Sequence, residues 1–211
     1  MNDLRYIGTC SELIAVITGC IYYYKYKNTY LKYFLALLFY VFINEIFGKY
    51  LREHITNYNA IIYNIYYIIN FTYLFLLYQH YITDKVYKIC IKYFLVAYLI
   101  SVVINGFYEN YLIQFQRIPY IIAASFLIIT ILFYFIETIN SDTILQVNKS
   151  LLFWISIGLL IYYSGVLPTR IVRNYYQHQA NAKVLFLINL ITGSIMYICF
   201  SIGFIRSKKN R

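Results

Sequence analysis

The sequence predicts an all-α, polytopic membrane protein, and three observations lead to this fold class. Hydrophobic residues make up 62% of the 211 residues and charged residues only 12%, whereas soluble domains carry about 25% charged residues. The apolar residues form continuous runs without alternation, which favours helices over a β-barrel in lipid. The charged residues lie mostly between these runs. Too little polar sequence remains to cover a soluble core.

Seven apolar runs are long enough to cross a hydrocarbon core, which takes roughly 20 residues in a helix. We expect a single seven-helix transmembrane domain over residues 1–211, with spans near 5–24, 31–51, 60–81, 87–105, 118–138, 151–172 and 184–205. The connections are short, so consecutive helices are expected to be neighbours in a bundle. No kinase, nuclease or nucleotide-binding domain fits into these connections.

The distribution of the 18 Lys and Arg residues predicts the orientation in the membrane. Seven of them fall on the side of the N-terminus and eleven on the opposite side, which together account for all 18. Because positive residues accumulate in the cytoplasm, we expect the N-terminus outside and the C-terminus inside, in the inner (plasma) membrane. The C-terminal stretch 206–211 is expected to rest on anionic lipid. This topology accounts for the net charge of +10 without a nucleic-acid partner.

A short internal similarity predicts two parallel halves. Between the second and third spans, Lys49 and Arg52 precede Asn59-Ala60. Between the sixth and seventh spans, Arg170 and Arg173 precede Asn181-Ala182 in the same way. With the fourth span as an inversion linker, these halves would form a 3+1+3 arrangement.

Polar residues inside the spans define a candidate site. A carboxylate at the bilayer centre costs at least about 2.5 kcal/mol, so such groups tend to face the interior of the bundle. Helical spacing places the polar residues of five spans on faces that converge toward the outer leaflet. We therefore predict an outward-facing polar cavity, which binds a ligand or holds ion pairs, lined by Glu12, Asn44, Glu45, Arg52, Tyr63, Tyr67, Asn70, Tyr162, Arg170, Arg173 and Asn189.

A purely structural role is the alternative for each of these residues. The two glutamates would then pair with the arginines and lock the bundle. Asn70 and Asn189 would hydrogen-bond neighbouring helices. The glycines of the sixth and seventh spans, among them Gly158, Gly165 and Gly193, are expected to permit close contact between helices.

The chain carries no recognisable catalytic, metal-binding or cofactor-binding motif. It contains no HExxH, no Gly-rich phosphate loop and no GxSxG, and its three His residues are far apart. The four Cys residues form no CxxC pair. We expect a protein without enzymatic activity, without a cofactor and without a metal ion.

Three stretches carry a resemblance to a known group of proteins: Asn44-Glu45, the run Tyr63-Asn64-Ile65-Tyr66-Tyr67, and residues 153–158 with Tyr162-Tyr163. They resemble small bacterial seven-helix membrane proteins that are similar to the sensor modules of membrane histidine kinases. The resemblance implies a membrane sensor or ligand-binding module that signals through a separate partner chain. Two other functions stay open, an oligomeric pore or membrane-acting defence effector, and a small-solute transporter of 3+1+3 design. The expected partners are the lipid bilayer, a signalling or effector protein and further copies of the chain.

Overall fold

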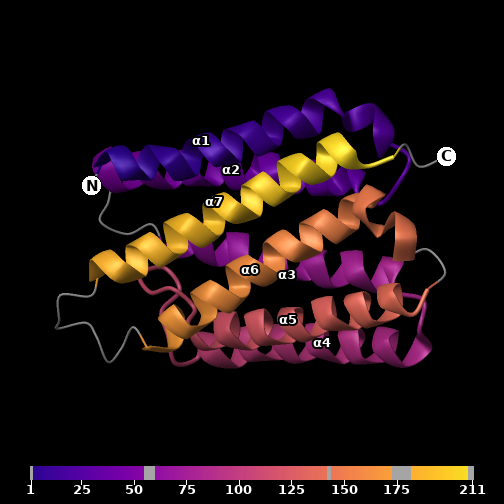
Figure 1. Cartoon of the computed structure of the whole chain (residues 1–211). Helices are drawn as coiled ribbons and strands as arrows, with labels where there is room; N and C mark the ends of the chain where they lie inside the picture. The colour runs from indigo at the N-terminus through magenta and orange to yellow at the C-terminus, as the bar shows by residue number, and fades with distance from the viewer. Residues whose placement is uncertain (1, 55–59, 142–143, 173–181, 209–211) are drawn as a thin grey trace. The chain divides into compact units, whose positions relative to one another are not determined.

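The computed structural model describes residues 2–54, 60–141, 144–172 and 182–208. Within these ranges the chain contains α-helices and short 3-10 helices and no strand, which confirms the all-α prediction (Figure 1). The elements are α1 (Asn2–Ile21), η1 (Tyr23–Lys25), α2 (Lys32–His54), α3 (Ala60–Tyr81), α4 (Lys85–Gly106), α5 (Ile118–Ile139), η2 (Ile144–Lys149), α6 (Leu151–Val172) and α7 (Ala182–Arg206).

Five of the described helices, α3 to α7, are long and apolar enough to cross a membrane. They support the prediction of a helical membrane protein. The apolar part of α1, Ile7–Ile21, is shorter, and α2 is not among the five. Seven crossings, the orientation and the 3+1+3 repeat therefore stay predictions. Of the residues that indicate the repeat, Asn59, Arg173 and Asn181 lie outside the described residues, as does the side chain of Lys49.

The chain forms two compact units. Unit 1 comprises residues 1–38 and 138–211, and unit 2 comprises residues 39–137. Helix α2 runs from unit 1 into unit 2. The prediction of a single seven-helix domain is not tested by this division.

Unit 1 packs α1 and α6 along α7, with glycines at the contacts (Figure 1). A Cβ atom on Gly165 would lie 2.6 Å from Thr192 Cγ2, and one on Gly158 would lie 3.0 Å from the backbone oxygen of Met196. The predicted close contact at these two glycines is confirmed. It is wrong for Gly193, where the nearest atom to an added Cβ would be 3.9 Å away.

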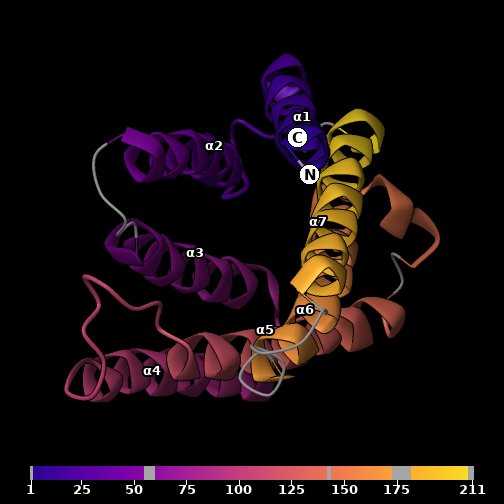
Figure 2. The same ribbon diagram turned by 90° about the vertical axis from the view of Figure 1, so that its left-hand side faces the viewer.

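Unit 2 is packed mainly through aromatic rings. The ring of Tyr87 stacks on Phe133 at 4.4 Å and 3°, and that of Phe94 stacks on Phe126 at 4.4 Å and 9°. These pairs join α4 and α5, which run side by side (Figure 2). Offset stacking of this kind contributes about 1 kcal/mol per pair beyond the area that it buries. Helix α4 otherwise exposes most of its surface, and its buried residues recur every seven positions, at Ile91, Tyr98 and Asn105.

The end of unit 2 that holds the α3–α4 turn is fixed by two carboxylates. Asp84 caps α4 by accepting hydrogen bonds from the backbone N–H groups of Val86 and Tyr87 at 2.8 and 3.0 Å. Glu137, near the end of α5, accepts hydrogen bonds from the backbone N–H and the hydroxyl of Thr83. The start of α3, the end of α4 and the start of α5 therefore share the opposite end of the unit.

Candidate functional site

The connection between α4 and α5, residues 107–117, is held by a buried amide of α3. Asn64 Nδ2 donates hydrogen bonds to the backbone oxygens of Tyr111 and Gln114, at 2.9 and 2.8 Å. Asn64 Oδ1 accepts from the backbone N–H of Gln116 at 3.0 Å, and Gln116 Nε2 donates to the backbone oxygen of Asn64 at 2.8 Å. Both side chains are only 1% exposed. Because these bonds are shielded from water, they fix the path of the connection.

A second group of hydrogen bonds ties the connection to the end of α4. Asn105, which is buried, donates through Nδ2 to Glu109 Oε2 at 2.7 Å, and the same nitrogen lies 3.3 Å from Tyr111 Oη. The hydroxyl of Tyr111 donates to the backbone oxygen of Val102 at 2.6 Å. Burial and the charge of Glu109 raise the pKa of Tyr111, and the hydrogen bond from Asn105 opposes this rise. The phenol serves as a donor within this group of hydrogen bonds.

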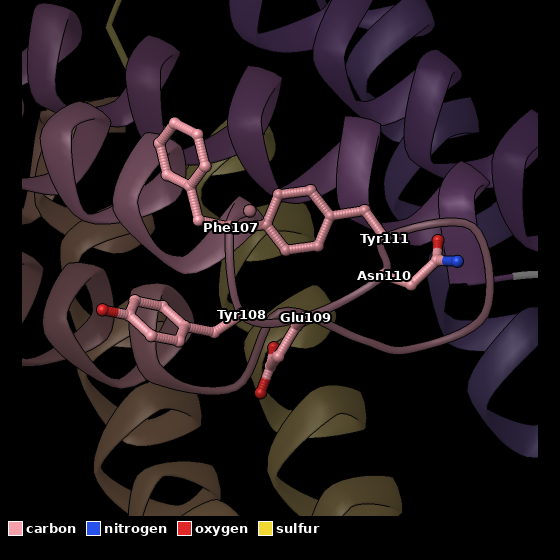
Figure 3. A pocket seen from close by; sticks show the side chains of 6 residues that line it. Phe107, Tyr108, Glu109, Asn110 and Tyr111 are labelled. Atoms are coloured by element: carbon pink, nitrogen blue, oxygen red, sulfur yellow. The ribbon is translucent and has the colours of Figure 1, made fainter.

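An open hollow of about 440 Å³ lies in this connection (Figure 3). Tyr108 and Glu109 lie next to each other at one edge of the hollow. Phe107 and Tyr108 are 83% and 85% exposed, and Glu109 is half-buried. The hollow thus combines a fixed carboxylate with aromatic rings. Its lining residues are Gly106, Phe107, Tyr108, Glu109, Asn110 and Tyr111.

Two residues of the predicted polar cavity lie near this end of unit 2, Tyr63 against the connection and Tyr67 against the start of α5. The ring of Tyr63 is 5.8 Å from that of Phe115, and the ring of Tyr67 packs edge-on against Tyr120 at 5.0 Å. The hydroxyl of Tyr63 also comes within 2.8 Å of the position of a Cβ on Gly48, near the end of α2. The structure therefore brings part of the predicted site to the same end of unit 2 as the hollow.

The other predicted cavity residues of unit 2 lie on α2 and α3. Asn44 and Asn70 are buried, with 7% and 6% of their surface exposed, and Glu45 is half-buried. Their burial agrees with polar groups that face the interior of a helix bundle. Arg52 has its backbone in α2, but its side chain lies outside the described residues.

The remaining cavity residues belong to unit 1. Glu12 is fully buried on α1, and Tyr162 and Arg170 are half-buried on α6. Asn189 donates a hydrogen bond from Nδ2 to the backbone oxygen of Leu185 at 2.9 Å, within its own helix and not to a neighbouring one. Arg173 lies outside the described residues. Because the predicted residues are divided between the two units, a common cavity stays a prediction.

No metal-binding group emerges from the side chains that the structure describes. Among them, no three His, Cys, Asp or Glu residues gather closely enough to hold a metal ion. The hollow offers one carboxylate and three aromatic rings, which is a donor set for a cation of organic type and not for a divalent metal.

No protein-family model, no curated protein and no solved structure matches this chain. The resemblance to membrane sensor modules therefore stays a prediction. The chemistry of the α4–α5 connection carries the functional conclusion.

Proposed function

We propose that the chain is an integral membrane sensor whose ligand-binding surface is the α4–α5 connection. The observation that carries this proposal is the open hollow of about 440 Å³ in a connection pinned by Asn64 and Gln116. Small-molecule sites are concave, have volumes of about 300–1,000 Å³ and are usually formed before the ligand binds. Side chains that are already ordered lose less entropy on binding. The pinned connection meets the condition of prior order, and its widely open hollow has a volume within this range.

The lining of the hollow favours a small organic cation as the ligand. Glu109 supplies a negative charge, and the rings of Phe107, Tyr108 and Tyr111 supply π faces. A cation within ~6 Å of such a ring is attracted by its quadrupole, and quaternary ammonium groups are bound in this way. We therefore expect a compact amine or quaternary ammonium compound on the predicted outer side of the membrane.

The hydrogen bonds of the connection provide a route for the signal. A cation at Glu109 competes with Asn105 for the carboxylate, and Asn105 stands at the end of α4. Helix α4 joins α5 through its stacked rings, and α4 begins and α5 ends near the turn held by Glu137. A small shift of α4 against α5 would thus reach the predicted inner side, where a separate signalling chain would read it.

A tryptophan placed in the hollow tests ligand binding. We would replace the single Trp154 by Phe, introduce Tyr108→Trp and embed the protein in nanodiscs of phosphatidylglycerol, which lacks an amine headgroup. Titration with tetramethylammonium or ethylammonium should give a saturable change in fluorescence. Adding Glu109→Gln should weaken binding by about tenfold or more, because the charge is lost.

Tyr93→Trp is the matched control, because Tyr93 is a 69% exposed tyrosine in the middle of α4. It should show no saturable response to the same cations. An absent response at Tyr108→Trp, or a response that Glu109→Gln leaves unchanged, would overturn the proposed site.

Flux measurements separate the sensor from the pore and the transporter. Liposomes that contain the purified protein should show no ion current and no accumulation of the ammonium compound. Saturable uptake would replace the sensor by a transporter, and an ion current without saturation would replace it by a pore.

A further inference from the structure

Three segments that are distant in the sequence meet at one end of unit 1. Lys25 Nζ donates hydrogen bonds to the backbone oxygens of Phe204 and Ile205, at 3.2 and 2.6 Å. The backbone N–H of Lys208 donates to the backbone oxygen of Lys149 at 3.0 Å. The connection after α1, the η2 segment before α6 and the end of α7 are thereby joined.

The joined segments carry a concentration of positive charge, which we call the basic end. It consists of Lys25, Lys27, Lys149, Arg206 and Lys208. The side chain of Lys25 is half-buried, and the other four are exposed. Among the described side chains of unit 1, Glu12 in the middle of α1 is the only carboxylate, and Asp142 lies outside the described residues. Like charges repel one another, so a bound anion would stabilise their arrangement.

Two cations of the basic end are held in place beside aromatic rings. Lys25 Nζ donates to the two carbonyl oxygens at the end of α7 and also lies 4.4 Å from the centre of the Tyr22 ring, so Lys25 contributes positive charge to the basic end. The guanidinium of Arg206 lies 6.0 Å from the centre of the Trp154 ring. At this distance the ring attracts the charge of the guanidinium and leaves the N–H donors in its plane, which suit a phosphate.

The aromatic residues around the basic end match the depth of lipid headgroups. Trp154 Nε1 donates to the backbone oxygen of Asn148 at 2.9 Å, so the indole has its polar edge at the start of α6. Tyr23 and Tyr24 are exposed beside Lys25. Trp and Tyr gather at the membrane–water interface, where phospholipid phosphates also lie.

We propose that the basic end of unit 1 binds a phosphate group, with the headgroup of an anionic phospholipid as its source. Arg206 and Lys208 would supply the donors, Lys25 would add positive charge, and the start of α6 and the end of α7 would face the acyl chains. This site shares no residue with the amine site in unit 2, so the two proposals are independent of each other.

Trp154 is the only tryptophan in the chain and provides the readout. In nanodiscs of phosphatidylcholine, we would compare quenching of Trp154 by phosphatidylglycerol brominated in its chains with quenching by phosphatidylcholine brominated in the same way. The ratio reports the relative affinity for the two headgroups next to Trp154. The wild-type protein should prefer phosphatidylglycerol. Arg206→Gln combined with Lys208→Gln should reduce that preference by about fivefold for each charge removed.

Two further variants distinguish a built site from general charge attraction. Lys85→Gln combined with Lys92→Gln removes two exposed cations from α4 in unit 2 and should leave the preference unchanged. Arg206→Lys keeps the charge and should retain most of the preference. Equal losses in both double variants, or no preference in the wild-type protein, would overturn the proposal.

Inorganic phosphate distinguishes the two sources of the ligand. The preference for phosphatidylglycerol is measured with inorganic phosphate and with chloride at the same ionic strength. If the basic end binds the headgroup of a lipid, phosphate should reduce the preference no more than chloride does. If phosphate reduces it more, the basic end takes phosphate from solution, and the assignment to a lipid is overturned.

Discussion

The two units of the chain are held together by different kinds of contact. Six of the eight glycines lie in unit 1, and at five of these an added Cβ would come within 3.3 Å of another side chain or backbone atom. Unit 2 has only two glycines and relies on stacked rings and on the amide bonds of Asn64. In lipid, little hydrophobic force acts between helices, so close packing and hydrogen bonding are the two means of association. Close contacts at glycines are concentrated in unit 1, and the buried amide network of Asn64 belongs to unit 2.

This difference also separates the two proposed sites. The amine hollow of unit 2 lies in a connection whose path is set by buried hydrogen bonds. The basic end of unit 1 lies where tightly packed helices finish and a lysine bonds the last carbonyl groups of α7. We therefore expect mutations of the unit 2 network to affect ligand binding and mutations at glycines of unit 1 to affect stability alone.

The largest effect is expected at Gly203, one of the closest glycine contacts between α6 and α7. In Gly203→Ala the new Cβ would lie 2.7 Å from Trp154 Cβ, and neither helix backbone yields easily. The free energy of unfolding should fall by about 2–3 kcal/mol, as for overpacked cores. Unfolding of the purified protein in mixed micelles measures it. Gly193→Ala, where the nearest atom is 3.9 Å away, should change stability by no more than about 0.5 kcal/mol.

The corresponding change in unit 2 is Asn64→Leu. It leaves the backbone oxygens of Tyr111 and Gln114 and the N–H of Gln116 without their partner. We expect a loss of about 2 kcal/mol and faster hydrogen exchange at the amide of Gln116. Gln114→Ala removes an exposed amide but keeps the backbone oxygen, and it should leave exchange unchanged. Equal exchange in Asn64→Leu and wild type would mean that other contacts hold the connection.

The helix positions could be predicted from the sequence because they depend on local composition. The predicted span 60–81 matches α3, and the predicted span 151–172 matches α6. Each apolar run is bounded by polar residues, and helix is the structure that satisfies its backbone in lipid. The predicted span 5–24 extends past the end of α1 at Ile21, since the tyrosines that follow are apolar in composition but lie in a 3-10 turn.

The α4–α5 connection could not be predicted, because its partners are distant in the sequence. Asn64 bonds residues that lie 47 to 52 positions away, and each of the four bonds has as one partner a backbone group that no sequence pattern marks. In the sequence Asn64 is one polar residue among tyrosines. Tyr63 and Tyr67 were predictable as part of a polar face, since that follows from helical spacing alone. The fully buried Glu12 follows the same rule in unit 1.

A smaller effect is expected from the stacked rings of unit 2. Phe94→Leu removes the stack with Phe126 at 4.4 Å and should lower the free energy of unfolding by about 1 kcal/mol. Tyr93→Leu changes the neighbouring, 69% exposed ring and should have little effect. If both variants lower the free energy of unfolding by the same amount, the stacking of Phe94 on Phe126 adds no stability beyond that of an exposed ring. The contrast between the units would then rest on Asn64 alone.

The smallest effect is expected for Lys25→Met, since two opposing terms act on this ammonium. The hydrogen bonds to the last carbonyl groups of α7 favour its charge, whereas burial lowers the pKa of Lys25 below its ordinary value. Near neutral pH the variant should differ from wild type by about 0.5 kcal/mol or less.

The pH dependence of that difference shows which term prevails at Lys25. A base whose pKa is lowered by folding releases its proton in the folded state while the unfolded chain still holds it. Wild-type stability should therefore rise relative to Lys25→Met as the pH approaches about 10. Lys27→Met removes an exposed charge from the same segment and controls for net charge. A difference that falls with rising pH would mean that the carbonyl groups of α7 outweigh burial, and the basic end would then hold its lysine without needing an anion.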